Sequence, residues 1–234
     1  MSVLGSPRTT TLGTSPTSAV LARVAGGLAL AHVALMLGGF SLERSTMLGD
    51  GTAEARRAFA EGSLARSMTG GYIEAFSFVV LLPVLVYLAG ALGRRTEAGR
   101  WAAQTGLAAG VGYVAVTLAT GLPAGAAALY DGHHGADPAT LVVAADIRNF
   151  AFFLSLLLLG AHAICVGLSA RADGVLTRWA GIGGIVVGVV LLASVAGAGQ
   201  ALQNVGTMVW LVWWVGLAVA LLRNSGVPAG DAAR

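Results

Sequence analysis

The chain has 234 residues, of which 56% are hydrophobic and only 11% charged, and its formal net charge is +3. Soluble domains carry about a quarter of charged residues, so this composition argues against an ordinary soluble domain and predicts a membrane protein. The small net charge and the lack of a basic motif argue against nucleic acid as a partner. A single cysteine, Cys165, leaves no intramolecular disulfide to form.

Six predominantly apolar runs follow one another at about 20–40, 72–92, 101–122, 141–168, 179–202 and 205–222. Crossing a hydrocarbon core of about 30 Å takes about 20 helical residues. None of the runs alternates with period two, and a helix satisfies its own backbone donors in lipid. We therefore predict an all-α polytopic bundle of six transmembrane helices over 19–223, between a disordered cytoplasmic leader (1–18) and a disordered tail (224–234).

Arginine is the only basic residue besides histidine, and apart from Arg148 in the fourth run the arginines outside the 41–70 connection gather on one side of the predicted bundle. They are Arg8, Arg23, Arg94, Arg95, Arg100, Arg171, Arg178, Arg223 and Arg234. The opposite short loops, 131–140 and the turn near Asn204, contain no arginine. This pattern predicts that both termini are cytoplasmic. The use of arginine without lysine and the abundance of Ala and Gly suggest a bacterial plasma-membrane protein.

The long connection 41–70 has four arginines and four acidic residues, so its charges balance. Glu54, Arg57 and Glu61 follow one another at helical spacing, and Phe59 and Leu64 are the only bulky anchors. We predict a short helix here, lying on the outer surface.

Small residues mark the third and fifth runs, which contain the pairs Gly106 and Gly110, Gly121 and Gly125, and Gly184 and Gly188, each with three residues between. Such pairs let helix backbones approach closely, so we expect these two helices to be central in the bundle. The same faces could also join two copies into a homo-oligomer. Pro123 removes a backbone donor and should kink or end the third helix.

The fourth run carries Asp146, Arg148 and Asn149 close to its outer end. Charged groups inside a membrane are expensive unless they face a partner or a cavity. Asp146 and Arg148 point in different directions on a helix, so we expect Arg148 to pair with Glu74, at the outer end of the second run, while Asn149 shares a face with Asp146. Gln200 lies at the same depth.

Two interpretations of these polar groups are open. One is a solvated rim with a structural ion pair between the second and fourth helices. The other is an outward-facing pocket for a small polar ligand or ion, formed by Glu74, Asp146, Arg148, Asn149 and Gln200.

Histidines raise the question of a metal or a haem. His133 and His134, with two carboxylates nearby, have the ligand types that suit Zn or Cu, but adjacent histidines usually diverge, so a polar turn is favoured over a metal site. His32 and His162 lie at different depths, which disfavours haem, and each can serve instead as an interhelical hydrogen-bond donor. We predict no cofactor.

Three tryptophans, Trp210, Trp213 and Trp214, share one face of the sixth helix, which predicts a packing stripe or, alternatively, an aromatic wall for a ligand. The chain has no catalytic triad, Walker loop or dinucleotide fingerprint, so an enzyme is disfavoured.

Three segments, "VLARVAGGLAL" (20–30), "AEARRAFAEGSLARSMTGGYIE" (53–74) and "LLGAHAICVGLSARADGVLTRWAGIGGI" (158–185), resemble a family of uncharacterised bacterial membrane proteins, a domain of unknown function. Gly160, His162 and Gly167 match its Gly-x-His and following Gly, whereas Thr177 stands where the family has proline before Arg178 and Gly181. The resemblance implies the six-helix fold and no activity. Three functions are therefore weighed: binding or transport of a small polar ligand, a non-catalytic membrane scaffold or partner-binding subunit, and, less favoured, a metal-dependent membrane enzyme.

Overall fold

The computed structural model describes residues 16–44, 46–174, 176, 178–196 and 200–223, with the side chains of 16–18, 178, 200 and 201 outside the description. The elements are α1 (Pro16–Phe40), α2 (Thr52–Phe59), α3 (Leu64–Ala91), α4 (Glu97–Val116), η1 (Thr117–Gly121), α5 (Leu122–His133), α6 (Pro138–Asp173), α7 (Arg178–Ala196) and α8 (Gln200–Arg223). Six of the described helical segments are long and apolar enough to cross a membrane. The predicted all-α fold with six spans is confirmed, whereas the predicted leader and tail lie outside the described residues.

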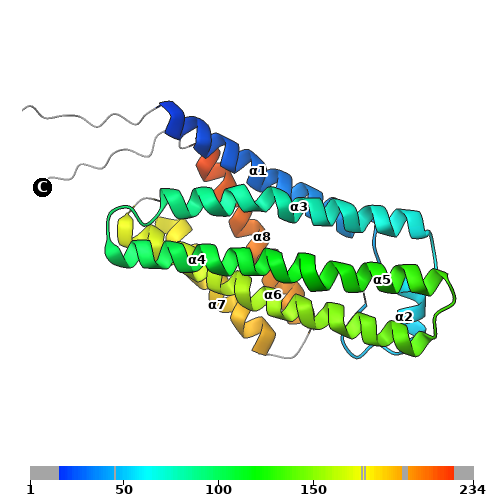
Figure 1. The fold of residues 1–234 in the computed structure, drawn as a ribbon. Coiled ribbons are helices and arrows are strands. Elements are labelled where there is room, and N and C mark those ends of the chain that lie inside the picture. The colour runs from blue at the N-terminus through cyan, green and yellow to red at the C-terminus, as the bar shows by residue number, and fades with distance from the viewer. Residues whose placement is uncertain (1–15, 45, 175, 177, 197–199, 224–234) are drawn as a thin grey trace, which may run out of the picture.

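Two of the spans are longer than a bilayer requires. The third, Glu97–His133, has 37 residues and the fourth, Pro138–Asp173, has 36, which at 1.5 Å per residue is about 55 Å against a core of about 30 Å. Both run on past α7 and α8 at the end where α2 is docked (Figure 1). We call this end the α2 end and the opposite end, which carries the α3–α4 connection, the arginine end.

The central helix is α6, the fourth span, and not the third and fifth spans as the glycine pattern suggested. In the most apolar window of each span, 56% of the α6 residues are buried, against 22% in the third span and 39% in the fifth. The glycines do allow close approach, as expected, but toward α6: a Cβ on Gly188 would lie 2.5 Å from the Gly160 carbonyl oxygen, and one on Gly106 would lie 3.0 Å from Cys165 Cβ. Small residues on α4 and α7 therefore place both helices against the same partner.

Pro123 does not end the third span, which continues as one helical segment from Glu97 to His133. Five residues before α5, Thr117–Gly121, form a π-helix, in which the Leu122 N–H donates to the Thr117 carbonyl five residues back. Proline has no N–H and its ring would clash with the carbonyl four residues earlier in an α-helix, so the wider π turn accommodates it. The π-helix turns different side chains inward than a continuous α-helix would.

Both buried histidines join helices, as predicted. His32 Nδ1 donates to the Ser77 carbonyl at 2.9 Å, linking α1 to α3, and His162 Nδ1 donates to the Gly106 carbonyl at 2.8 Å, linking α6 to α4. Trp210 and Trp214 stack at 5.4 Å between ring centroids. The three tryptophans of α8 are buried at 1%, 5% and 1% exposure, as a packing stripe requires, and Trp210 also borders a cavity.

Asp173 holds the arginine end together. Its carboxylate accepts hydrogen bonds from the backbone N–H groups of Arg94, Arg95 and Thr96 and from the Thr96 hydroxyl, at 2.7 to 3.3 Å. These four contacts join the last turn of α6 to the connection between α3 and α4. The carboxylate is 3% exposed, so its charge is satisfied by this ring of donors.

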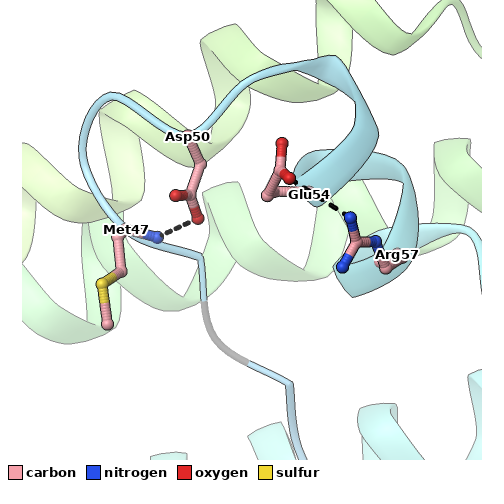
Figure 2. A network of polar contacts seen from close by, with 4 residues as sticks. All are labelled: Met47, Asp50, Glu54 and Arg57. Atoms are coloured by element: carbon pink, nitrogen blue, oxygen red, sulfur yellow. Dashed lines mark hydrogen bonds and ion pairs between the residues drawn. The ribbon is translucent and has the colours of Figure 1, made fainter.

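The short helix predicted in the 41–70 connection is present as α2. Phe59, fully buried, anchors it against α5 and α6. Figure 2 shows the connection that leads into it: the Met47 N–H donates to Asp50 at 2.7 Å, and Glu54 pairs with Arg57 at 3.2 Å on the surface. Because α2 ends at Phe59, Glu61 lies beyond the helix.

Candidate functional site

The ion pair at the α2 end joins Arg148 to Glu43, and not to Glu74 as the sequence suggested. Arg148 Nη2 lies 2.8 Å from Glu43 Oε2, and the two side chains are 19% and 8% exposed. Gly125 on α5 makes room for the arginine, because a Cβ there would lie 3.2 Å from Arg148 Cδ. The pair therefore joins α6 to the connection that follows α1.

Glycines bring the two glutamates together. A Cβ on Gly39 would lie 2.8 Å from the Gly70 carbonyl oxygen and 3.0 Å from the Glu74 nitrogen, so α1 and α3 touch backbone to backbone. A Cβ on Gly70 would lie 2.9 Å from Glu43 Cγ, so the Glu43 side chain packs against α3 one turn before Glu74, and both glutamates line one cavity. Glu74 is 6% exposed, and its Oε2 accepts no hydrogen bond from the described residues.

Beside this triad of Glu43, Glu74 and Arg148 lies a cavity of about 330 Å³, which we call the main cavity. Its described lining comes from α1, the connection after it, α3, α4, η1, the first residue of α5, α6 and α8. The second and fourth spans, which carry the predicted Glu74, Arg148 and Asn149, both contribute, whereas no described residue of α7, the fifth span, lines the cavity. The first and sixth spans take that place.

The main cavity changes character with depth. Its rim is polar, with the triad, Asn149 and Asn204, whereas its floor is aromatic and aliphatic, with Phe78, Tyr113, Leu156, Leu159 and Trp210. From Asn149 to Leu159, α6 descends about 15 Å at 1.5 Å per residue. The cavity thus reaches from the polar end of the spans toward the middle of the bundle.

The mouth of the main cavity is marked by lining residues that are exposed. Phe40 at the end of α1, Met47 in the connection and Met208 on α8 are 39%, 48% and 50% exposed. Asn204, in the first turns of α8, is also exposed. Access therefore lies between the end of α1 and the start of α8, beside the connection drawn in Figure 2.

A second cavity of about 220 Å³, the side cavity, lies on α3, η1 and α5. It shares Glu43, Leu122 and Arg148 with the main cavity. The ion pair and Leu122 therefore lie where the two spaces adjoin. The side cavity is bordered by Tyr72, which is 70% exposed.

Only some of the predicted site residues line the main cavity. Glu74, Arg148 and Asn149 line the main cavity, and Asn149 is 6% exposed with an Nδ2 that donates to no described residue. Asp146 is half-buried and is not one of the described residues that line the cavity. The side chain of Gln200 lies outside the described residues.

Glu43 and Thr117 line the main cavity but were not predicted from the sequence to do so. Glu43 stands in a connection whose charges balance, so it read as part of a solvated loop. A usable signal was its position three residues past the first apolar run, level with Glu74 and Arg148. Thr117 lines the cavity because of the π-helix, which the sequence pattern did not predict.

The adjacent histidines of α5 and its C-terminal turn diverge, as expected. His133 Nδ1 donates to the Leu129 carbonyl at 2.9 Å, while His134 Nδ1 donates to the Tyr130 carbonyl at 2.6 Å and its ring stacks on Tyr130. Among the described residues, no group of three or more His, Cys, Asp or Glu side chains is arranged to hold a metal ion. These two side chains complete the last turn of the helix.

Comparison of the chain with family models, with curated proteins and with solved structures finds no match. The resemblance to a six-helix family of unknown function therefore stays a prediction. The fold and the site rest on the chain's own residues.

Proposed function

We propose that this multi-pass membrane protein binds a small ligand with a polar group in the main cavity, in the plasma membrane of a bacterium and with both termini cytoplasmic. On that orientation the cavity opens outward, because its mouth lies at the α2 end and the arginine loops lie at the other end. A ligand taken up there would reach mid-membrane depth while its polar group stayed at the rim.

The observation that carries the proposal is a set of buried polar atoms around one cavity. Glu74 Oε2, Asn149 Nδ2 and Trp210 Nε1 have no hydrogen-bond partner among the described residues, and all three residues line the main cavity. Buried polar groups nearly always find partners, so a cluster of such atoms around one cavity needs an explanation. A ligand that both accepts and donates hydrogen bonds would satisfy them.

The volume and lining of the cavity agree with this use. Ligand sites are clefts of about 300 to 1,000 Å³, mostly apolar, with a few polar groups that fix orientation. The main cavity, at about 330 Å³, has that pattern, with its charged groups on one side only. A packed scaffold would be expected to fill this space with side chains.

The test is a ligand screen by thermal stabilisation of the detergent-purified protein, with two matched variants. Ser155→Phe places a ring in the main cavity, because Ser155 lines it and is 3% exposed. Leu154→Phe places the same ring on the outer surface, because Leu154 is 48% exposed. A ligand at 100 times its Kd stabilises by about 2.7 kcal/mol.

We expect compounds that stabilise the wild type and Leu154→Phe to leave Ser155→Phe unchanged. Stabilisation that persists in a folded Ser155→Phe protein would place the ligand elsewhere and refute the proposal.

A further inference from the structure

The charge of the triad identifies the kind of ligand, given the proposed function on which this inference rests. Glu43, Glu74 and Arg148 sum to one negative charge when all three are ionised. Arg148 is bonded to Glu43 at 2.8 Å, which leaves Glu74 as the carboxyl group without a cation of its own. A carboxylate that is 94% buried is costly unless a positive charge or a proton neutralises it.

Among the described residues that line the cavity, Arg148 is the one cation. The connection after α1 contributes Glu43, α4 contributes Tyr113, and α6 contributes Arg148. The described α8 residues that line the cavity, Asn204, Thr207, Met208 and Trp210, are all uncharged. A buried carboxyl group without a cation of its own is neutral while it keeps its proton, and it can ionise when another cation takes the proton's place.

The walls below Glu74 suit the body of an organic cation. Phe78 follows one turn later on α3, its ring 5.4 Å from that of Tyr113, and Tyr113 lies 6.5 Å from Trp210, each pair edge to face. Aromatic faces attract cations and also accept apolar groups. An anionic ligand would meet two carboxyl groups and an arginine that is already engaged.

We infer that the main cavity binds small organic cations with an apolar body, and that Glu74 exchanges its proton for the positive charge of the ligand. In this step the O–H bond of the Glu74 carboxyl breaks, its electron pair stays on the oxygen and the proton leaves to the solvent. The ligand's cationic group then takes the proton's place beside the carboxylate, while its apolar part lies against Phe78, Tyr113 and Trp210. No covalent bond to the ligand forms.

The experiment uses benzyltrimethylammonium as the probe, because its permanent charge carries no proton that it could release. Titration calorimetry on the full-length protein in detergent, in two buffers of different ionisation enthalpy, counts the protons released on binding. Neopentylbenzene, its neutral isostere, and 3-phenylpropionate, an anion, are the comparison ligands. Glu74→Gln removes the charge, and Glu54→Gln, at the exposed ion pair of α2, is the matched control.

We expect the cation to bind with release of about one proton, to bind more weakly by up to about tenfold for each pH unit of acidification, and to lose at least about tenfold in affinity in Glu74→Gln but not in Glu54→Gln. Proton release on binding is measured with the wild type alone. The exchange of a proton for the cation can therefore be tested even if Glu74→Gln fails to fold.

Equal binding of the neutral isostere or the anion, binding without proton release, or no binding of the cation at millimolar concentration would each overturn the inference. The proposed function fails separately, and only if ligands found in the thermal screen still stabilise Ser155→Phe. If a neutral ligand stabilises the wild type but not Ser155→Phe, the proposed binding site stands and the inference that the site prefers cations is refuted.

Discussion

Replacing Arg148 by methionine should destabilise the bundle by about 3 kcal/mol. Methionine keeps much of the length of the side chain and removes its charge, so the change isolates the ion pair. Removal of one partner of a buried pair costs about 3 to 5 kcal/mol, because the other charge is left buried. The side chains of Arg148 and Glu43 are 19% and 8% exposed, which places the expected loss at the lower end of that range.

The arrangement of the triad predicts that replacing its members destabilises the protein by different amounts. In Arg148→Met, two carboxyl groups face each other without a cation, whereas in Glu43→Gln the arginine keeps Glu74 as a neighbour. We therefore expect Glu43→Gln to cost less than Arg148→Met. The double variant should cost less than the sum of the single changes by about 2 kcal/mol, because it removes both charges of the bonded pair.

Reversible unfolding in mixed micelles with increasing SDS measures these differences. The control is Arg57→Met, which breaks the pair with Glu54 at 3.2 Å, where the side chains are 63% and 45% exposed. Such an exposed pair contributes only about 0 to 1 kcal/mol. If Arg148→Met costs no more than Arg57→Met, or if the single effects add within about 0.5 kcal/mol, the buried ion pair does not exist as described.

Three further outcomes are expected from the structure. Gly188→Ala should destabilise by about 1 to 3 kcal/mol in the same unfolding assay, since its new Cβ would lie 2.5 Å from a backbone oxygen of α6, whereas Gly27→Ala, with nothing within 4 Å, should not. Asp173→Ala should cost about 2 to 3 kcal/mol, because four donors of the α3–α4 connection lose their acceptor, and a loss below about 0.5 kcal/mol would contradict that role. In intact cells, a membrane-impermeant thiol reagent should label Glu61→Cys and not Glu97→Cys, and the reverse pattern would invert the proposed orientation.

Much of the architecture was open to prediction because it depends on local properties of the chain. A membrane span needs about 20 apolar residues, and a helix bonds its own backbone, so hydropathy alone located all six spans. The α2 surface helix, the interhelical bonds of His32 and His162 and the buried stripe of Trp210 could likewise be predicted from residue type and spacing. These features need no knowledge of which helix lies beside which.

The candidate site was predictable only in part. Glu74, Arg148 and Asn149 could be singled out because charged and amide groups are expensive near lipid wherever the helix is placed. The partner of Arg148 could not, because several acidic side chains lie at a similar depth and only the crossing of α1 and α3 at Gly39 selects Glu43. Asp146 has the same local signature as Arg148 but does not line the cavity.

The sequence by itself thus determined that this is a six-span helical membrane protein with costly polar groups near one end of its spans. Only the tertiary structure decided that α6 is central, that a π-helix precedes Pro123, and that two glutamates share one arginine beside a cavity. The physical reason is range: helix formation and insertion depend on residues a few positions apart, whereas an ion pair or a cavity depends on how helices distant in sequence pack.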